Sequence, residues 1–282
     1  MEMFQRATSP WGEDILVRVS WDLLWFAVIG SAIFLLIHQV LRRRWIGKKA
    51  EATGDLSGIP EKVARHTLPS RLFHWVMAAS MLVLLFTGFL PIVGITFSWV
   101  VIHWWAGVAL IACVIFHMVH ATVRWTFKEV WISLRDMREW WASMRAVMGS
   151  GAETKPGKYP VDNKLYHYAI IVTSLGVAVT GVLMMMAIDT PFFARDPYFL
   201  SEGTWGLVFV IHGLAAIGLV GLVIAHIYFA ILPEKLWMTK AMIFGWITRK
   251  NYTYYDSERW SVEDSGESPG EAPVDAPVSE TS

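Results

Sequence analysis

The sequence of 282 residues contains one cysteine, Cys113, and no Cys-x-x-Cys-His motif. An intrachain disulfide and a covalently attached c-type haem are therefore both excluded. Charged residues are scarce as well, at 17%, whereas soluble domains contain about 25%. No glycine-rich phosphate loop, Ser-His-Asp order or pair of membrane carboxylates stands out, so the sequence does not indicate a hydrolytic or group-transfer enzyme. The formal net charge of zero gives no indication of a nucleic-acid partner.

Apolar residues are abundant instead, at 55% of the chain, and 16 residues are tryptophan. A run of about 20 apolar residues can cross a bilayer as a helix. The sequence has five such runs: Val19–Leu41, Leu72–Val93, Trp99–Val123, Leu165–Ile188 and Gly206–Leu232. The first is too long for the core of a signal peptide, and its basic cluster follows it, so it predicts a retained helix. We therefore expect an all-α integral membrane bundle of five transmembrane helices, a four-helix core with one extra N-terminal helix.

Basic residues are concentrated on one side of these spans. Of the 24 Lys and Arg residues, 21 lie in the segments 42–71, 124–164 and 233–260, and three lie in the segments on the other side. Lysine and arginine favour the cytoplasmic side of a membrane. This distribution predicts a multi-pass protein of the bacterial inner membrane with a periplasmic N-terminus and a cytoplasmic C-terminus.

The pattern divides the chain into three regions. Residues 1–61 comprise the extra helix and a cytoplasmic linker, residues 62–256 the four-helix domain, and residues 257–282 an acidic, proline-containing tail. Such a tail cannot bury a core, so we expect it to be disordered. Within the second region, residues 127–148 have apolar positions three and four residues apart, which predicts an amphipathic helix on the inner membrane surface.

The histidines belong to an internal repeat. In each half of the core, a histidine at the inner end of one span is followed thirteen residues later by Thr-Gly, and the next span has two histidines fourteen residues apart. The matching sets are His74, Thr87-Gly88, His103 and His117 in the first half, and His167, Thr180-Gly181, His212 and His226 in the second. This agreement indicates that the two halves arose by duplication.

Imidazole groups inside hydrocarbon are costly and mark functional sites. Residues fourteen positions apart lie about 21 Å apart along a helix and on almost the same face. Two helices with such pairs could hold two flat metal macrocycles stacked across the membrane, and neutral imidazole is a standard axial ligand of haem iron. By depth, His103 and His212 are expected to share the outer site.

The inner site has more candidates. His226 is the strongest, as the deep partner of His212. Its mate stays open at this point: the spacing symmetry favours His117, whereas the His-Trp at the entry of the second span favours His74. Two more histidines lie at this level. His120 could ligate iron, or it could hydrogen-bond a haem propionate or a neighbouring carbonyl. For His167, a structural role or a role at the edge of a bound quinone fits better than ligation.

Several motifs resemble the di-haem cytochrome b (gamma) subunit of respiratory formate dehydrogenases. They are Arg71-Leu-Phe-His74-Trp75, Ile102-His103 with Gly107, and Ile211-His212 with Ala225-His226-Ile227-Tyr228. The wider superfamily includes the cytochrome b subunits of nickel–iron hydrogenase and thiosulfate reductase. Gly157-Lys158-Tyr159 and Thr239–Gly245 favour the formate dehydrogenase branch, although residue 160 is proline where that family has asparagine. The resemblance covers about residues 62–250.

The resemblance implies two b haems, with His74 and His226 as iron ligands of the inner haem and His103 and His212 of the outer one. It implies a hetero-oligomer in which a periplasmic iron–sulfur subunit and a molybdenum or tungsten catalytic subunit exchange electrons with menaquinone or ubiquinone. It also places the quinone beside the loop that leads into the fourth span. There, Asn163 and Lys164 could donate to quinone carbonyls and Asp162 could pass protons; the loop also contains Tyr159.

Two other functions remain open on the sequence alone. One is a cytochrome b subunit of a hydrogenase or thiosulfate-reductase type complex, with the same haems and another partner. The other is a haem-free helical anchor or transporter in which the histidines relay protons. Haem absorption bands in the purified chain would separate the cytochromes from the haem-free protein.

Overall fold

The computed structural model describes residues 2–45, 58–123, 127–147, 155–192, 194–257 and 260. These residues are mostly helical, with four short strands. In chain order the elements are β1 (Phe4–Thr8), β2 (Asp14–Val19), α1 (Asp22–Trp45), β3 (Lys62–Ala64), α2 (Leu68–Phe89), the 3-10 helix η2 (Leu90–Val93), α3 (Trp99–Val123), α4 (Phe127–Val130), α5 (Leu134–Val147), α6 (Val161–Met185), α7 (Glu202–Ile231), α8 (Leu236–Phe244), β4 (Trp246–Thr248) and α9 (Arg249–Tyr252).

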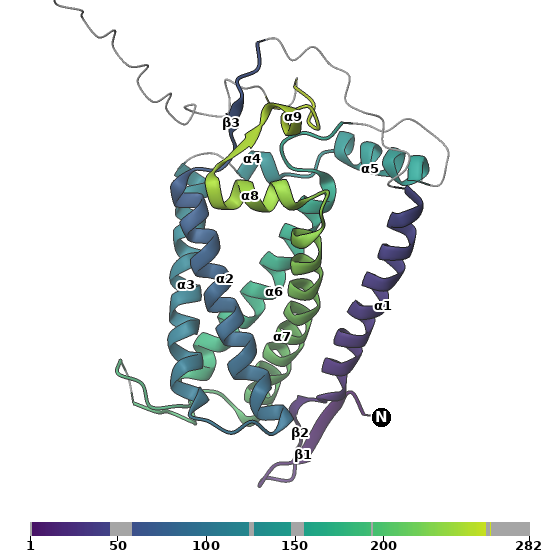
Figure 1. Cartoon of the computed structure of the whole chain (residues 1–282). Coiled ribbons are helices and arrows are strands. Elements are labelled where there is room, and N and C mark those ends of the chain that lie inside the picture. The colour runs from purple at the N-terminus through teal and green to yellow at the C-terminus, as the bar shows by residue number, and fades with distance from the viewer. Residues whose placement is uncertain are drawn as a thin grey trace, which may run out of the picture. The chain divides into compact units, whose positions relative to one another are not determined.

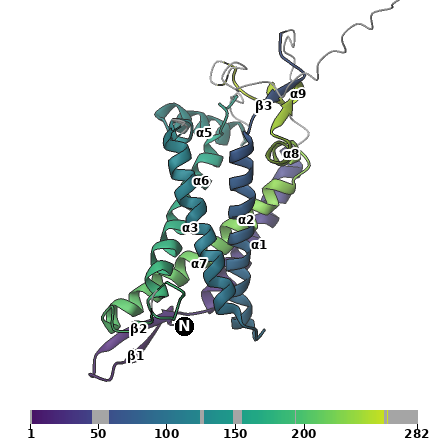
Figure 2. The ribbon, with the colours of Figure 1, turned by 90° about the vertical axis from the view of Figure 1, so that its left-hand side faces the viewer.

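Among the described residues, five helices are long and apolar enough to cross a membrane, which confirms the expected fold class. Their apolar spans are Asp22–Arg42, Leu68–Val93, Trp99–Val123, Val161–Met185 and Glu202–Ile231. Each overlaps one of the runs expected from the sequence. In Figures 1 and 2, α2, α3, α6 and α7 run alongside one another, and α1 lies next to α7.

The chain divides into two compact units. The first comprises residues 1–48, 72–132 and 162–229, and the second comprises residues 49–71, 133–161 and 230–282. The first unit thus contains most of every membrane-spanning helix. The expected disordered tail lies outside the described residues, apart from residues 257 and 260.

An apolar cluster fills the middle of the four-helix core. Met81, Leu110, Val177 and Leu219 come from α2, α3, α6 and α7, and all four are buried. Leu110 lies seven residues from the histidine on either side of it in α3, and Leu219 has the same position in α7. The cluster therefore separates the histidines of each helix into two levels.

A β-hairpin precedes α1, which the sequence analysis did not anticipate. β1 and β2 pair antiparallel, and Gly12 has a φ of +85° in the connecting turn. The Ser9 hydroxyl accepts hydrogen bonds from the backbone N–H groups of Trp11 and Glu13, each at 3.2 Å. These bonds satisfy two backbone N–H groups of the turn and stabilise the short connection between the two strands.

The hairpin packs against α7 at two glycines. A Cβ atom at Gly206 would overlap the backbone carbonyl of Leu16, and one at Gly213 would lie 2.5 Å from a methyl carbon of Val19. Small residues allow this close approach of two backbones. Val19 is itself only 1% exposed and belongs to an apolar cluster with Leu24 and Ile217.

We expect Gly206→Ala to destabilise the protein, because the added Cβ overlaps a backbone carbonyl and the chain must shift. Such overpacking costs about 1–3 kcal/mol, and the melting temperature of the protein in detergent should fall by several degrees. Gly203→Ala in the first turn of α7 is the matched control, since no atom lies within 4 Å of a Cβ there. Equal melting temperatures for the two variants would contradict the packing of β2 on α7.

The expected amphipathic helix over residues 127–148 is divided in the structure. α4 ends at Val130, and α5 begins at Leu134 after a break. Ser133 and Asp136 cause the new start: the Ser133 hydroxyl accepts from the Asp136 backbone N–H at 3.1 Å, and the Asp136 carboxylate accepts from the Ser133 backbone N–H at 2.9 Å. This reciprocal pair is a capping box, which satisfies N–H groups at the first turn of a helix.

The second unit is organised around a buried arginine. Arg65 is 7% exposed. Its guanidinium group donates to the Tyr255 hydroxyl and to the Lys158 carbonyl oxygen, the latter at 3.3 Å. The same group lies 5.5 Å from the ring centre of Trp260. Because a guanidinium group carries several donors in a fixed plane, it can join the segment that contains Lys158 to the end of the described chain.

Candidate functional site

Two histidine pairs lie at different levels of the four-helix core. His103 on α3 and His212 on α7 have ring centres 6.4 Å apart, with an angle of 59° between the rings. His74 on α2 and His226 on α7 have ring centres 6.2 Å apart, at 51°. The structure thus brings together the four histidines that the resemblance implied, in the same two pairs.

The separation within each pair matches axial coordination of one metal ion. Two imidazoles bound on opposite sides of a metal, each at about 2 Å, have ring centres roughly 6 Å apart, because each centre lies about 1 Å behind its nitrogen. Within the described ranges, no three His, Cys, Asp or Glu side chains gather where they could hold a metal ion. Each pair could therefore supply two ligands, which is the number that a haem iron needs from the protein.

Threonines orient the rings of His103 and His212. The Thr87 hydroxyl donates to the Val83 carbonyl oxygen at 2.7 Å and lies 2.8 Å from Nδ1 of His103. Since its one proton is engaged with the carbonyl, the hydroxyl accepts the Nδ1 proton of the histidine. We assign this tautomer from the hydrogen-bond network. It leaves Nε2 of His103 with a lone pair for a metal ion.

The second half of the repeat has the same arrangement. The Thr180 hydroxyl donates to the Gly176 carbonyl oxygen at 2.5 Å and lies 2.9 Å from Nδ1 of His212. The glycine after each threonine lies beside the ring: a Cβ at Gly88 would be 3.7 Å from Cε1 of His103, and one at Gly181 would be 3.6 Å from Cε1 of His212. The Thr-Gly repeat therefore belongs to the site itself, which its spacing in the sequence did not reveal.

The inner pair is supported by aromatic rings. Tyr166 on α6 stacks on His226, with ring centres 5.3 Å apart and an angle of 18°. Trp75 packs edge-on against His74 at 5.2 Å. The other candidate for the inner site, His117, lies against His167 instead, at 6.0 Å. Of the two mates that the sequence left open for His226, the structure places His74 beside it.

The expected quinone loop takes a different form. Residues 161–164 form the first turn of α6 rather than a loop. Lys164 is 6% exposed, and its ammonium group donates to the Trp131 carbonyl oxygen at 2.9 Å. Asp162 and Asn163 are exposed on the same turn. Tyr159 belongs to the second unit, where the Lys158 ammonium group lies 5.6 Å from its ring centre.

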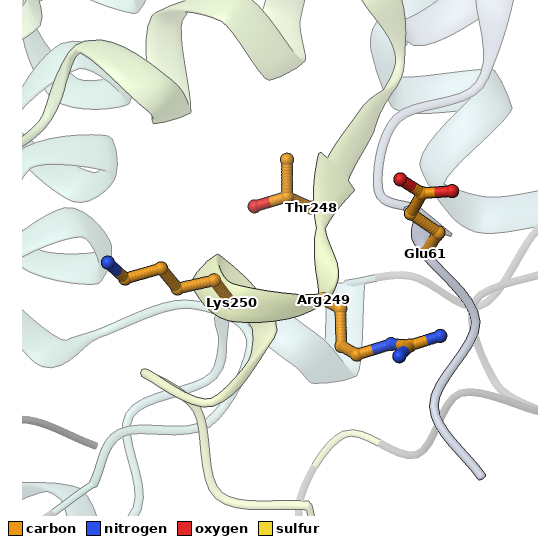
Figure 3. A pocket seen from close by; sticks show the side chains of 4 residues that line it. All are labelled: Glu61, Thr248, Arg249 and Lys250. Atoms are coloured by element: carbon orange, nitrogen blue, oxygen red, sulfur yellow. The ribbon is translucent and has the colours of Figure 1, made fainter. Parts of the chain in front are cut away.

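A surface pocket lies in the second unit (Figure 3). Its lining consists of Glu61, Thr248, Arg249 and Lys250. None of the histidines takes part in it. The pocket therefore does not contribute to the paired-histidine sites.

Paired histidines between membrane-spanning helices are the ligand arrangement of a b-type cytochrome. The model of the prokaryotic cytochrome b561 family matches residues 65–245, and the chain belongs to this family. Membership implies haem b. Together with the five apolar helices, it supports a multi-pass inner membrane protein.

Curated relatives agree with the family. The chain is 25% identical over 205 residues to the formate dehydrogenase cytochrome b556(fdo) subunit of Escherichia coli K12, a match that covers 67% of this chain and 87% of the relative. The subunit of the same name from Escherichia coli O157:H7 matches equally well. These findings confirm the resemblance seen in the sequence.

We expect Thr87→Val and Thr180→Val to weaken haem binding, because each removes the hydroxyl that holds a histidine ring in its tautomer and orientation. Loss of such a partner costs about 10–100-fold in metal affinity. Titration of haem into the apoprotein measures the effect. Thr173→Val is the control on α6, because the Thr173 hydroxyl donates to the Ala169 carbonyl oxygen and contacts no histidine. Equal haem affinity in all three variants would show that the threonines do not orient the ligands.

Proposed function

We propose that this chain is the cytochrome b subunit of a respiratory complex of the formate dehydrogenase type, and that it carries electrons between a periplasmic partner and a membrane quinone. Two b haems, when bound, supply one-electron transfer across the membrane. The observation that carries the proposal is the pair of histidine sites with ring centres 6.4 and 6.2 Å apart, on helices long enough to span a bilayer.

His103 and His212 would hold the outer haem, and His74 and His226 the inner one. His212 and His226 lie fourteen residues apart on α7, which corresponds to about 21 Å along the axis. The two sites are therefore separated along the direction in which the helix crosses the membrane. The buried cluster around Leu110 and Leu219 keeps water and other polar groups out of the layer between them.

The distribution of basic residues supports the sidedness of this proposal. With 21 of the 24 Lys and Arg residues on one side, the N-terminus would be periplasmic and the C-terminus cytoplasmic. The partners would be a periplasmic iron–sulfur subunit and a molybdenum or tungsten catalytic subunit, as the resemblance to formate dehydrogenase cytochromes implies. The inner site would then serve menaquinone or ubiquinone, which takes up two electrons and two protons to form the quinol.

The turn that begins α6 is proposed to contribute to quinone binding through Asp162, Asn163 and Lys164, together with Tyr159. Asp162 and Asn163 are exposed, so their side chains can be reached by protons and by a ligand. The Lys164 ammonium group donates to the Trp131 carbonyl oxygen at 2.9 Å, which holds its side chain at the first turn of α6.

A visible spectrum of the purified chain tests the function directly. We expect sharp b-type bands after reduction with dithionite, and two haems per chain by the pyridine haemochrome assay. Protein made with an adequate supply of haem that shows no such bands would be a haem-free anchor or transporter, and the proposal would be rejected.

Substitution of single histidines tests the pairing. His103→Ala and His212→Ala should each remove one and the same haem, while His74→Ala and His226→Ala should each remove the other, because an iron with one axial histidine left is bound much more weakly. The haem content should fall from two to one in each variant, and the spectra should fall into two groups. His117→Ala is the control that keeps both haems; loss of a haem from it would reassign the inner ligand.

A further inference from the structure

The extra helix α1 forms hydrogen bonds to α7 close to one of the inner histidines. The Tyr228 hydroxyl of α7 lies 2.9 Å from Nδ1 of His38 and donates to the side-chain oxygen of Gln39 at 3.0 Å. Because its single proton is engaged with Gln39, the Tyr228 hydroxyl accepts the Nδ1 proton of His38, a tautomer that we assign from the hydrogen-bond network. His38 also packs edge-on against the Phe229 ring, with ring centres 5.0 Å apart. Two polar side chains of α1 thus bind one side chain of α7.

Tyr228 and His226 lie on opposite sides of α7. Two residues along an α-helix correspond to a rotation of about 200°. His226 lies beside His74 of α2, whereas Tyr228 contacts α1. A turn of α7 about its axis would therefore move the two side chains in opposite directions. At a radius of about 5–6 Å from the helix axis, a rotation of about 5° displaces a side chain by about 0.5 Å. Such a displacement is as large as the usual range of hydrogen-bond lengths, so the bonds to Tyr228 restrict the rotation of His226.

The helix α6 holds the same part of α7. Tyr166 stacks on His226 with ring centres 5.3 Å apart, and its hydroxyl donates to the Leu222 carbonyl oxygen at 3.2 Å. Leu222 precedes His226 by four residues, which is about one helical turn. The segment of α7 that contains His226 is therefore bound by α6 before the histidine and by α1 after it.

The inner pair depends on this support more than the outer pair does. Each ring of the outer pair shares a hydrogen bond with a threonine hydroxyl. For the rings of His74 and His226, no hydrogen-bond partner is found in the part of the chain that the structure describes. The orientation of His226 is therefore set by the helix that contains it and by the Tyr166 ring that packs on it.

We propose that His38 and Gln39 are positioning residues for the inner haem ligand His226 and that they act through Tyr228; this inference rests on the proposed function, which makes His226 a ligand. Groups that orient a ligating histidine affect both the affinity of the site and the reduction potential of its metal. The helix α1 precedes the segment that matches the family, residues 65–245. A part of the chain outside the family segment thus adjusts the inner haem and leaves the outer one alone.

The experiment measures haem affinity and the two haem potentials in the full chain in detergent. Tyr228→Phe removes both hydrogen bonds to α1 and keeps the ring, whereas His38→Phe removes one. A hydrogen bond between membrane helices is worth about a factor of three. We therefore expect the affinity of the inner site to fall about tenfold in Tyr228→Phe and about threefold in His38→Phe. A tenfold loss confined to one oxidation state shifts the inner potential by about 59 mV, while the outer potential stays unchanged.

Further readouts separate positioning from a general loss of stability. The largest g value of a low-spin ferric haem reports the angle between its two imidazole planes, and it should change at the inner haem alone. His38→Asn, which keeps an N–H donor near the position of Nδ1, should recover most of the loss in His38→Phe. The double variant of His38→Phe with Tyr228→Phe should match Tyr228→Phe alone, because His38 acts through Tyr228.

Ser31→Ala is the matched control on α1. It removes a hydroxyl that lies near Gly221 of α7 and should leave both haems as in the unmodified chain. Unchanged inner affinity, potential and g value in Tyr228→Phe would overturn the inference, and so would equal shifts of both haems. An unmodified chain that binds no haem rejects the proposed function and this inference with it, whereas two haems that ignore Tyr228→Phe reject this inference alone.

Discussion

An imidazole inside a bilayer has no water to satisfy its nitrogen atoms, and this constraint governs the arrangement of the four-helix core. His74 lies against His226, His103 against His212 and His117 against His167, and the two members of each pair come from different helices. The helices must therefore be held at a defined rotation, so that rings fourteen residues apart meet their partners at both levels. The apolar cluster between the levels fixes that rotation by packing one buried residue from each helix.

At the outer site, the internal sequence repeat produces the same threonine–histidine contact in both halves of the core. Thr87 and Thr180 occupy the same place in each half, and each holds the Nδ1 atom of a histidine on the next helix. Because both threonines donate their own proton to a backbone carbonyl of the preceding turn, the tautomer of both histidines is set by local helix geometry. Within the described segments, no threonine hydrogen-bonds to His74 or His226, and aromatic rings from α2 and α6 pack against these two histidines instead.

Much of this arrangement could be predicted from the sequence, because helices in a bilayer are determined by length and apolarity. The five spans, the two levels and the outer pairing of His103 with His212 follow from run lengths and from a spacing of fourteen residues. Hydrogen bonds between helices do not follow from spacing, so the role of the threonines emerged only from the structure. The N-terminal hairpin was missed because short strands depend on pairing between segments, which periodicity does not reveal. The breaks at Ser133 and Pro160 did have local signals: a capping box and a proline directly before the first turn of a helix.

α1 and the hairpin lie outside the segment that matches the family, residues 65–245, yet they contact the helix that contains two of the four candidate ligands. The contacts lie along one face of α7. They begin at Gly206 against Leu16 and at Gly213 against Val19. They continue at Gly221, where a Cβ would lie 3.4 Å from the Ser31 hydroxyl, and end at Tyr228. There the Tyr228 hydroxyl lies 2.9 Å from Nδ1 of His38 and donates to the Gln39 side chain at 3.0 Å. A polar bond at one end and glycine contacts at the other prevent α7 from turning about its axis. The extra helix thus stabilises the rotation of α7 that directs His212 and His226 toward their partners.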